Sequence, residues 1–191
     1  MKCFQRGEAA ALKIGCIGDS ITAGAHSSGP TMTYPAQLQK MLDPTKYAVT
    51  NLGACGSTMQ KGGDSPYWQR PQFQTLNSSK WDIIVIMLGT NDAKDPGDGG
   101  PNNWLNDCGA TLDTLDPVAN PCRFAKSYFD MIDLVRTLGT GGPNSPPAIY
   151  VAMPPPLMQH GSIGANQSAI NDVYPRLIPL IAQTKNVTTV P

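Results

Sequence analysis

The sequence of 191 residues is poor in histidine, in charge and in long apolar runs. Histidine occurs only at His26 and His160, and charged residues make up 15% of the chain, 14 basic against 14 acidic. A net charge of zero gives no electrostatic reason to expect nucleic acid or an anionic membrane surface as a partner. No apolar run approaches the roughly 20 residues of a membrane-spanning helix, so we expect no membrane span.

Cysteine usage leaves the cellular compartment open. The five cysteines are an odd number and form no C-x-x-C pair. Cys108 and Cys122 bracket a predicted loop, and this arrangement is compatible with a disulfide in an oxidising compartment or with two free thiols. Charged residues interrupt the N-terminal segment where a signal peptide would be apolar. Three glycosylation sequons nevertheless favour secretion weakly, at Asn77, Asn166 and Asn186.

Apolar runs of strand length alternate with segments of helical spacing. The predicted strands are residues 12–17, 47–52, 81–88, 148–153 and, more weakly, 186–190. The predicted helices are residues 34–42, 122–139 with Gly139 as a C-cap, and 166–184, where Pro175 and Pro179 require an early boundary or a kink. This alternation predicts one parallel α/β sheet with right-handed crossovers. We expect residues 1–11 to be an N-terminal extension and residues 12–191 to be one domain.

The ends of three predicted strands carry the groups that acyl transfer needs. Ser20 follows the first strand, Gly53 ends the second, and Asn91 follows the third. Because ligands bind at the carboxyl ends of parallel strands, these residues should meet at one rim. A hydroxyl could attack a carbonyl, while backbone and amide N–H groups stabilise the oxyanion. Each residue alone is more often a helix cap or a turn residue, but the ordered set favours a site.

Other chemistries find less support in the sequence. The first loop lacks the glycines and lysine of a phosphate-binding loop, and no cluster of His, Cys and Asp has metal-ligand spacing, so no metal or other cofactor is expected. Three aromatic side chains lie in predicted loops near the rim, and they could stack on sugar rings or anchor the loops to the domain: Tyr67, Trp68 and Trp104.

The motifs GDSIT, NLG and LGTND resemble the first three sequence blocks of the SGNH (GDSL-type) hydrolase superfamily. The resemblance implies a three-layer α/β/α, flavodoxin-like fold and a serine-dependent carboxylic-ester hydrolase. It also implies that Ser20 is the nucleophile that forms an acyl intermediate. The oxyanion hole would consist of the backbone N–H of Ser20, Gly53 and Asn91.

Further motifs are similar to a sialate O-acetylesterase-like subgroup of this superfamily. They are GGDSPYWQRPQF, IMLGTNDAKD, the tryptophan of PNNW, and MPPPL. The similarity extends over most of the chain from residue 12 onward. It implies a small-molecule or saccharide ester as substrate, and most specifically an O-acetylated carbohydrate.

The superfamily's fourth block, an Asp-x-x-His motif on a loop after the last strand, has no counterpart in the sequence. The predicted last strand runs to the final residue, Pro191. We therefore expect either a piece that stops before this block and lacks the last helix, or a natural pseudoenzyme. His26 and His160 lie in predicted loops at the correct rim, but neither has the Asp-x-x-His setting, so both are poor candidates for the general base. The alternative function is an inactive SGNH-like glycan-binding module.

Overall fold

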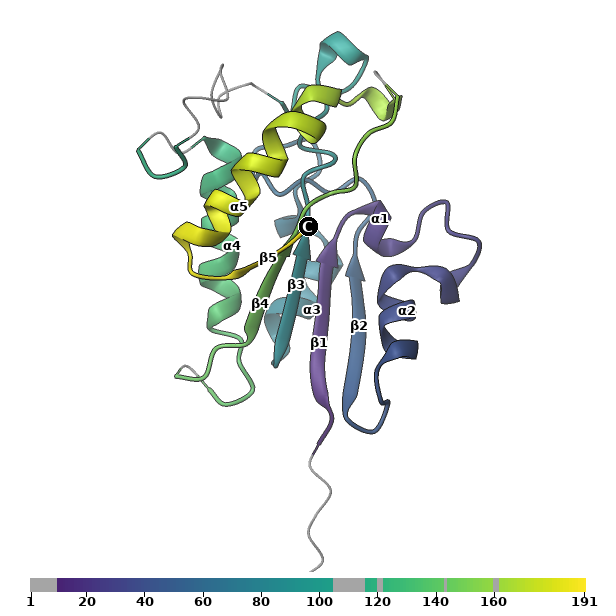
Figure 1. Ribbon diagram of the computed structural model, residues 1–191, viewed down its shortest axis with the longest axis vertical. Coiled ribbons are helices and arrows are strands. Elements are labelled where there is room, and N and C mark those ends of the chain that lie inside the picture. The colour runs from purple at the N-terminus through teal and green to yellow at the C-terminus, as the bar shows by residue number, and fades with distance from the viewer. Residues whose placement is uncertain (1–9, 105–115, 120–121, 143, 160–161) are drawn as a thin grey trace, which may run out of the picture.

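The computed structural model describes residues 10–104, 116–119, 122–142, 144–159 and 162–191. Five parallel strands form one sheet in the order β2-β1-β3-β4-β5 (Figure 1). The strands are β1 (Leu12–Gly18), β2 (Tyr47–Gly53), β3 (Ile83–Met87), β4 (Ala148–Ala152) and β5 (Thr188–Val190). The parallel α/β sheet predicted from the sequence is therefore confirmed.

The helices form layers on both sides of this sheet. They are α1 (Ser20–Ala23), α2 (Tyr34–Met41), α3 (Pro71–Ser78), α4 (Arg123–Arg136) and α5 (Tyr174–Thr184). The chain steps from β1 outward to β2, and then back across β1 to β3, β4 and β5. Because such crossovers are right-handed, α2 lies on one face of the sheet and α3, α4 and α5 lie on the other. This arrangement is the expected three-layer α/β/α fold. Within the described residues, no helix is long and apolar enough to cross a membrane.

Two helix ends differ from the prediction. Cys122 is the N-cap of α4 and its sulfur accepts a hydrogen bond from the Ala125 N–H at 3.4 Å. The C-cap of α4 is Thr137, not Gly139. A Cβ added at Gly139 would lie 1.8 Å from the Ser145 carbonyl oxygen, so this glycine is needed for close backbone packing. Cys122 is disulfide-bonded, whereas Cys108, its predicted partner, lies outside the described residues.

The prolines shape α5 as expected, whereas α3 was not predicted. Pro175 lies in the first turn of α5, after a π-helical turn over Ala169–Val173, and Pro179 lies inside the helix. In α3, with the sequence PQFQTLNS, Leu76 is the buried residue. A helix that buries so little presents no apolar stripe in the sequence.

The two faces of the sheet are buried to different extents. Along β3, Ile84 and Ile86 are fully buried in the core cluster, whereas Ile83 and Val85 on the other face are only partly buried. β4 alternates in a similar way up to its last residue. The main core therefore lies between the sheet and α3, α4 and α5.

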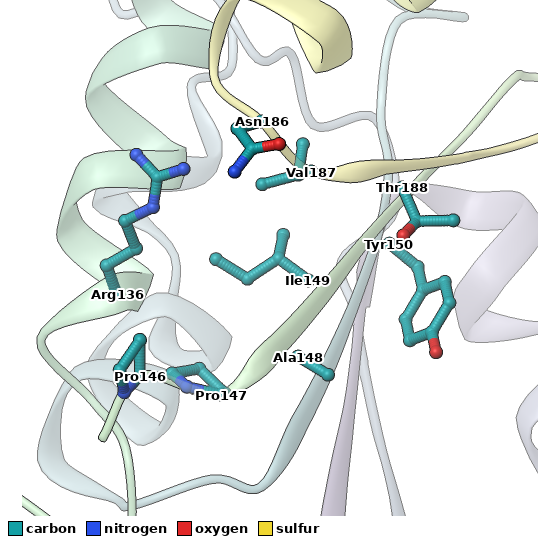
Figure 2. Close-up of a pocket in the computed structure, with 9 residues that line it drawn as sticks. All are labelled: Arg136, Pro146, Pro147, Ala148, Ile149, Tyr150, Asn186, Val187 and Thr188. Atoms are coloured by element: carbon teal, nitrogen blue, oxygen red, sulfur yellow. The ribbon is translucent and has the colours of Figure 1, made fainter.

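A polar hollow of about 360 Å³ opens between α4, the start of β4 and β5 (Figure 2). Figure 2 shows Arg136 and Asn186 on one side of it, and Tyr150 near Thr188 on the other. Arg136 is already engaged, since it donates to the Lys185 carbonyl and pairs with Asp133. The hollow involves the starting end of β4, so it is separate from the rim where Ser20 lies.

Candidate active site

The carboxyl ends of the three central strands lie level with one another. Gly18 at the end of β1 pairs with Gly53 of β2 on one side and with Met87 of β3 on the other. The residues that follow these three strands therefore start from the same rim. Ser20 and Asn91, which the sequence predicts to meet there, both follow strands that end at this level.

Asp19, and not Ser20, caps the short helix α1. The Asp19 carboxylate accepts the Ile21 N–H at 2.8 Å, while Ser20 is the first helical residue. The Ser20 carbonyl accepts hydrogen bonds from Gly24 and Ala25. The Ser20 side chain is partly exposed, and its hydroxyl makes no hydrogen bond within the described part of the chain. The capping role that a serine at this position would ordinarily have is thus filled by its neighbour.

Gly53 is a packing residue whose N–H group is engaged. Its N–H donates to the Asn51 side-chain oxygen at 2.9 Å. A Cβ at Gly53 would lie 2.2 Å from the backbone nitrogen of Ala23, so only glycine lets α1 approach β2 so closely. The Asn51 amide holds the same helix through the Thr22 carbonyl at 2.9 Å. The oxyanion role expected for Gly53 from the sequence would require this N–H to leave its bond to Asn51.

The loop that follows β2 passes over β1 to reach Asn91. The Ala54 N–H donates to the Gly18 carbonyl at 2.9 Å, and the Asn91 side-chain amide donates to the Ser57 carbonyl at 3.1 Å. Between these anchors Gly56 has a left-handed φ of 76°, which glycine adopts without steric cost. The Gly56 N–H has no acceptor among the residues that the structure describes. The sequence contains this glycine in ACGST, but nothing in the pattern singled it out.

Asp92 holds the loop that follows β2 through two backbone hydrogen bonds. Its two carboxylate oxygens accept the N–H groups of Met59 at 2.8 Å and Gln60 at 2.7 Å. The side chain is completely buried, and this burial raises the pKa of Asp92 to about 7, opposed by the two backbone hydrogen bonds. Burial also raises the pKa of Asp19, against the hydrogen bond from Ile21. Two buried carboxyl groups therefore support the rim, one beneath α1 and one beneath the loop.

Asn103 connects three segments around the site. Its side-chain amide donates to the Asn91 carbonyl at 2.9 Å and to Asp64 at 2.8 Å, while its own oxygen accepts the Asp64 N–H at 2.9 Å. The Gln60 side chain donates to its backbone carbonyl at 3.1 Å. Such a satisfied buried network fixes the relative positions of its members. Sequence reasoning missed this residue because its partners lie 12 to 43 positions away.

The three aromatic residues are loop anchors. Tyr67 is fully buried and donates to the Leu52 carbonyl at 2.8 Å, and Trp104 is 8% exposed. Trp68 packs on Phe73, and the Lys61 ammonium lies 4.3 Å from its ring centroid. Of the two roles considered from the sequence, anchoring fits these contacts. Tyr67 and Trp104 are buried, whereas Trp68 keeps part of its surface exposed.

His26 makes no hydrogen bond to Ser20. His26 is exposed in the loop after α1 with a φ of 61°, and His160 lies outside the described residues. The described residues also hold no cluster of three His, Cys, Asp or Glu side chains that could bind a metal ion.

Solved structures with this fold include several esterases. The structure of the native M. Smegmatis aryl esterase aligns with a TM-score of 0.63 and 20% identity, over 94% of this chain and 83% of that one. A carbohydrate acetylesterase family member from Sinorhizobium meliloti aligns with a TM-score of 0.61 and 22% identity, over 94% and 82% of the two chains. At these identities the likeness concerns the fold.

The model of the GDSL-like lipase/acylhydrolase family matches residues 16–191. The chain therefore belongs to this family of ester hydrolases, as the motifs at the three strand ends predicted. Over 95 residues it is also 40% identical to an acetylxylan esterase of Xylanibacter ruminicola, a match that covers 49% of this chain and 18% of that protein.

Proposed function

We propose that the chain is a serine-dependent carboxylic-ester hydrolase that acts through an acyl-Ser20 intermediate. The observation that carries this proposal is that Asp19, and not Ser20, caps the helix α1. Because Asp19 caps α1, the Ser20 hydroxyl is left without a structural partner among the described residues, at the rim where the strands end. A hydroxyl in this position is available for attack on an ester carbonyl.

The proposed reaction has two steps at Ser20. Its oxygen bonds to the ester carbonyl carbon, and collapse of the tetrahedral adduct breaks the bond to the alcohol, which leaves with a proton. Water then attacks the acyl-serine, releasing the acid and restoring the hydroxyl. Since the hydroxyl proton must be taken up in the first step, a general base is required.

The oxyanion of the adduct would be held by three N–H donors. The Ser20 N–H lies in the first turn of α1, where helical N–H groups lack intrahelical partners. Asn91 supplies a side-chain N–H. We assign the third donor to Gly56 in place of Gly53, because the Gly53 N–H donates to Asn51 whereas the Gly56 N–H has no acceptor among the described residues.

The proposed substrate is an O-acetylated carbohydrate. Support comes from the likeness to an acetylxylan esterase, to a carbohydrate acetylesterase fold, and to the sialate O-acetylesterase-like motifs. Tyr67 and Trp104 give no further support, because both are packed inside the domain. Trp68 is only partly buried.

An inactive glycan-binding module is the second candidate. It is favoured by one observation: within the described ranges, no side chain accepts the Ser20 hydroxyl proton. On this alternative, saccharide binding would survive Ser20→Ala, because the hydroxyl would have no chemical role.

Hydrolysis of p-nitrophenyl acetate by the wild-type chain, Ser20→Ala and Asn91→Ala separates the two candidates. The hydrolase predicts that Ser20→Ala lowers kcat by several powers of ten, and Asn91→Ala by about 10²–10³, as for loss of one oxyanion donor. Circular dichroism of each variant checks folding. If activity depends on Ser20, His26→Ala and His160→Ala test these side chains as the base. Equal rates of hydrolysis for the folded wild type and folded Ser20→Ala would contradict the hydrolase and favour the glycan-binding module.

A further inference from the structure

Arg70 makes a set of contacts that the proposed reaction does not explain. It lies just before α3, and its guanidinium reaches back to the loop after β2. One terminal nitrogen donates to the Cys55 carbonyl at 3.2 Å and also to the Ser65 hydroxyl. The Nε group donates to the Ser57 hydroxyl at 3.2 Å. No described carboxylate lies within ion-pair distance of this guanidinium.

The contact with Cys55 determines the direction of the next N–H group. In a trans peptide the C=O bond of one residue and the N–H bond of the next lie in one plane and point in opposite directions. No cis peptide bond occurs in the described backbone. Arg70 holds the Cys55 carbonyl on its own side. The Gly56 N–H must therefore point away from Arg70.

The loop that carries Gly56 is anchored at the strand ends. The loop is tied to the end of β1 through Gly18 and to Asn91 through Ser57, so Gly56 lies between the two strands that precede Ser20 and Asn91. The guanidinium also stays close, because its nitrogen lies 3.8 Å from the place that a Cβ of Gly56 would take. A cation that donates to a carbonyl polarises the whole peptide group, which makes its N–H a stronger donor.

We propose that Arg70 is a positioning residue for the oxyanion hole: it holds the Cys55–Gly56 peptide so that the Gly56 N–H faces the ester carbonyl attacked by Ser20. This inference rests on the proposed hydrolase function of the same site. Arg70 does not touch the substrate in this role. It acts on the transition state alone, because the oxyanion that the Gly56 N–H stabilises forms only there.

The test compares Arg70→Met and Arg70→Lys with the wild-type chain in p-nitrophenyl acetate hydrolysis. Arg70→Met removes every donor and should lower kcat about tenfold or more, with KM changed by less than about threefold. Arg70→Lys keeps a cation that can donate to Cys55 and should recover part of the loss. Lys80→Met is the matched control, since Lys80 also donates to a backbone carbonyl, that of Thr137 at 3.1 Å, but at the start of β3. It should leave both constants unchanged.

A second measurement follows the Gly56 amide directly in the 15N-labelled chain during titration with acetate, a carboxylate that can occupy the oxyanion hole. The wild-type Gly56 amide proton should shift on binding, and Arg70→Met should reduce that shift. Since this readout needs no turnover, an inactive wild-type chain would contradict the hydrolase function while still testing Arg70. Two kinetic results would overturn the proposal: an unchanged kcat in folded Arg70→Met, or a change confined to KM. A wild-type Gly56 amide proton that does not shift on addition of acetate would also overturn it.

Discussion

At the scale of single residues, Asp92 places a carboxyl group in the protein interior, where it holds a loop. Its carboxylate accepts two adjacent N–H groups, yet burial raises its pKa from 3.8 to about 7. Between these two pH values the folded chain keeps a proton at Asp92 that the unfolded chain has lost. The free energy of unfolding therefore falls as the pH rises through this window, by up to about 4 kcal/mol from this group.

The pH dependence of stability should change in Asp92→Asn. Asparagine does not titrate, so the fall in unfolding free energy between about pH 4 and pH 7 should become shallower. It should not vanish, because the raised pKa of Asp19 acts in the same direction. Urea unfolding of both proteins across this range measures the two slopes. Parallel slopes would show that Asp92 does not titrate in this window.

At the scale of elements, the approach of α1 to β2 depends on the absence of a side chain at Gly53. A Cβ there would press on the Ala23 backbone, which cannot rotate away. Gly53→Ala should therefore destabilise the fold by at least about 1–3 kcal/mol. Gly62→Ala is the matched control, because a Cβ at Gly62 meets nothing within 4 Å. Thermal unfolding compares the pair, and equal melting temperatures would contradict the packing role.

Elements were predictable where the local pattern determines them. The strand β3 is a continuous apolar run, β1 is apolar after Lys13, and α4 carries a stripe that buries Phe124, Met131 and Val135. In contrast, α3 could not be predicted because it buries little. The C-cap of α4 could not be predicted because Gly139 is needed for close packing against the Ser145 carbonyl and not for ending the helix.

The site could be predicted in part for the same reason. Ser20 and Asn91 follow strands of one parallel sheet that end level with one another, so a shared rim could be expected from the sequence. Our proposal of Gly56 in place of Gly53 depends on which N–H is already bonded, and that is set by tertiary contacts. The role that we propose for Arg70 could not be predicted from the sequence, because it depends on a contact with the Cys55 carbonyl, 15 positions away.

At the scale of the whole molecule, the two sheet faces contribute unequally to stability. Ile84 and Ile83 are adjacent and chemically identical, but Ile84 is fully buried in the core whereas Ile83 is partly exposed on the other face. Ile84→Ala should cost about 2–5 kcal/mol, and Ile83→Ala clearly less. Chemical denaturation of both variants makes the comparison. Equal costs would mean that the face carrying Ile83 is as well covered as the core.

The central place of β1 in the sheet has a consequence for how the protein acquires its shape. β1 is made before β3, but the two pair across more than sixty intervening residues (Figure 1). Closing such a loop has an entropic cost that must be met before the contacts form. Ser20 therefore emerges long before Asn91 can reach it, and a nascent chain carries the serine without its surroundings. The rim where the strand ends lie level forms only once β1, β2 and β3 have paired.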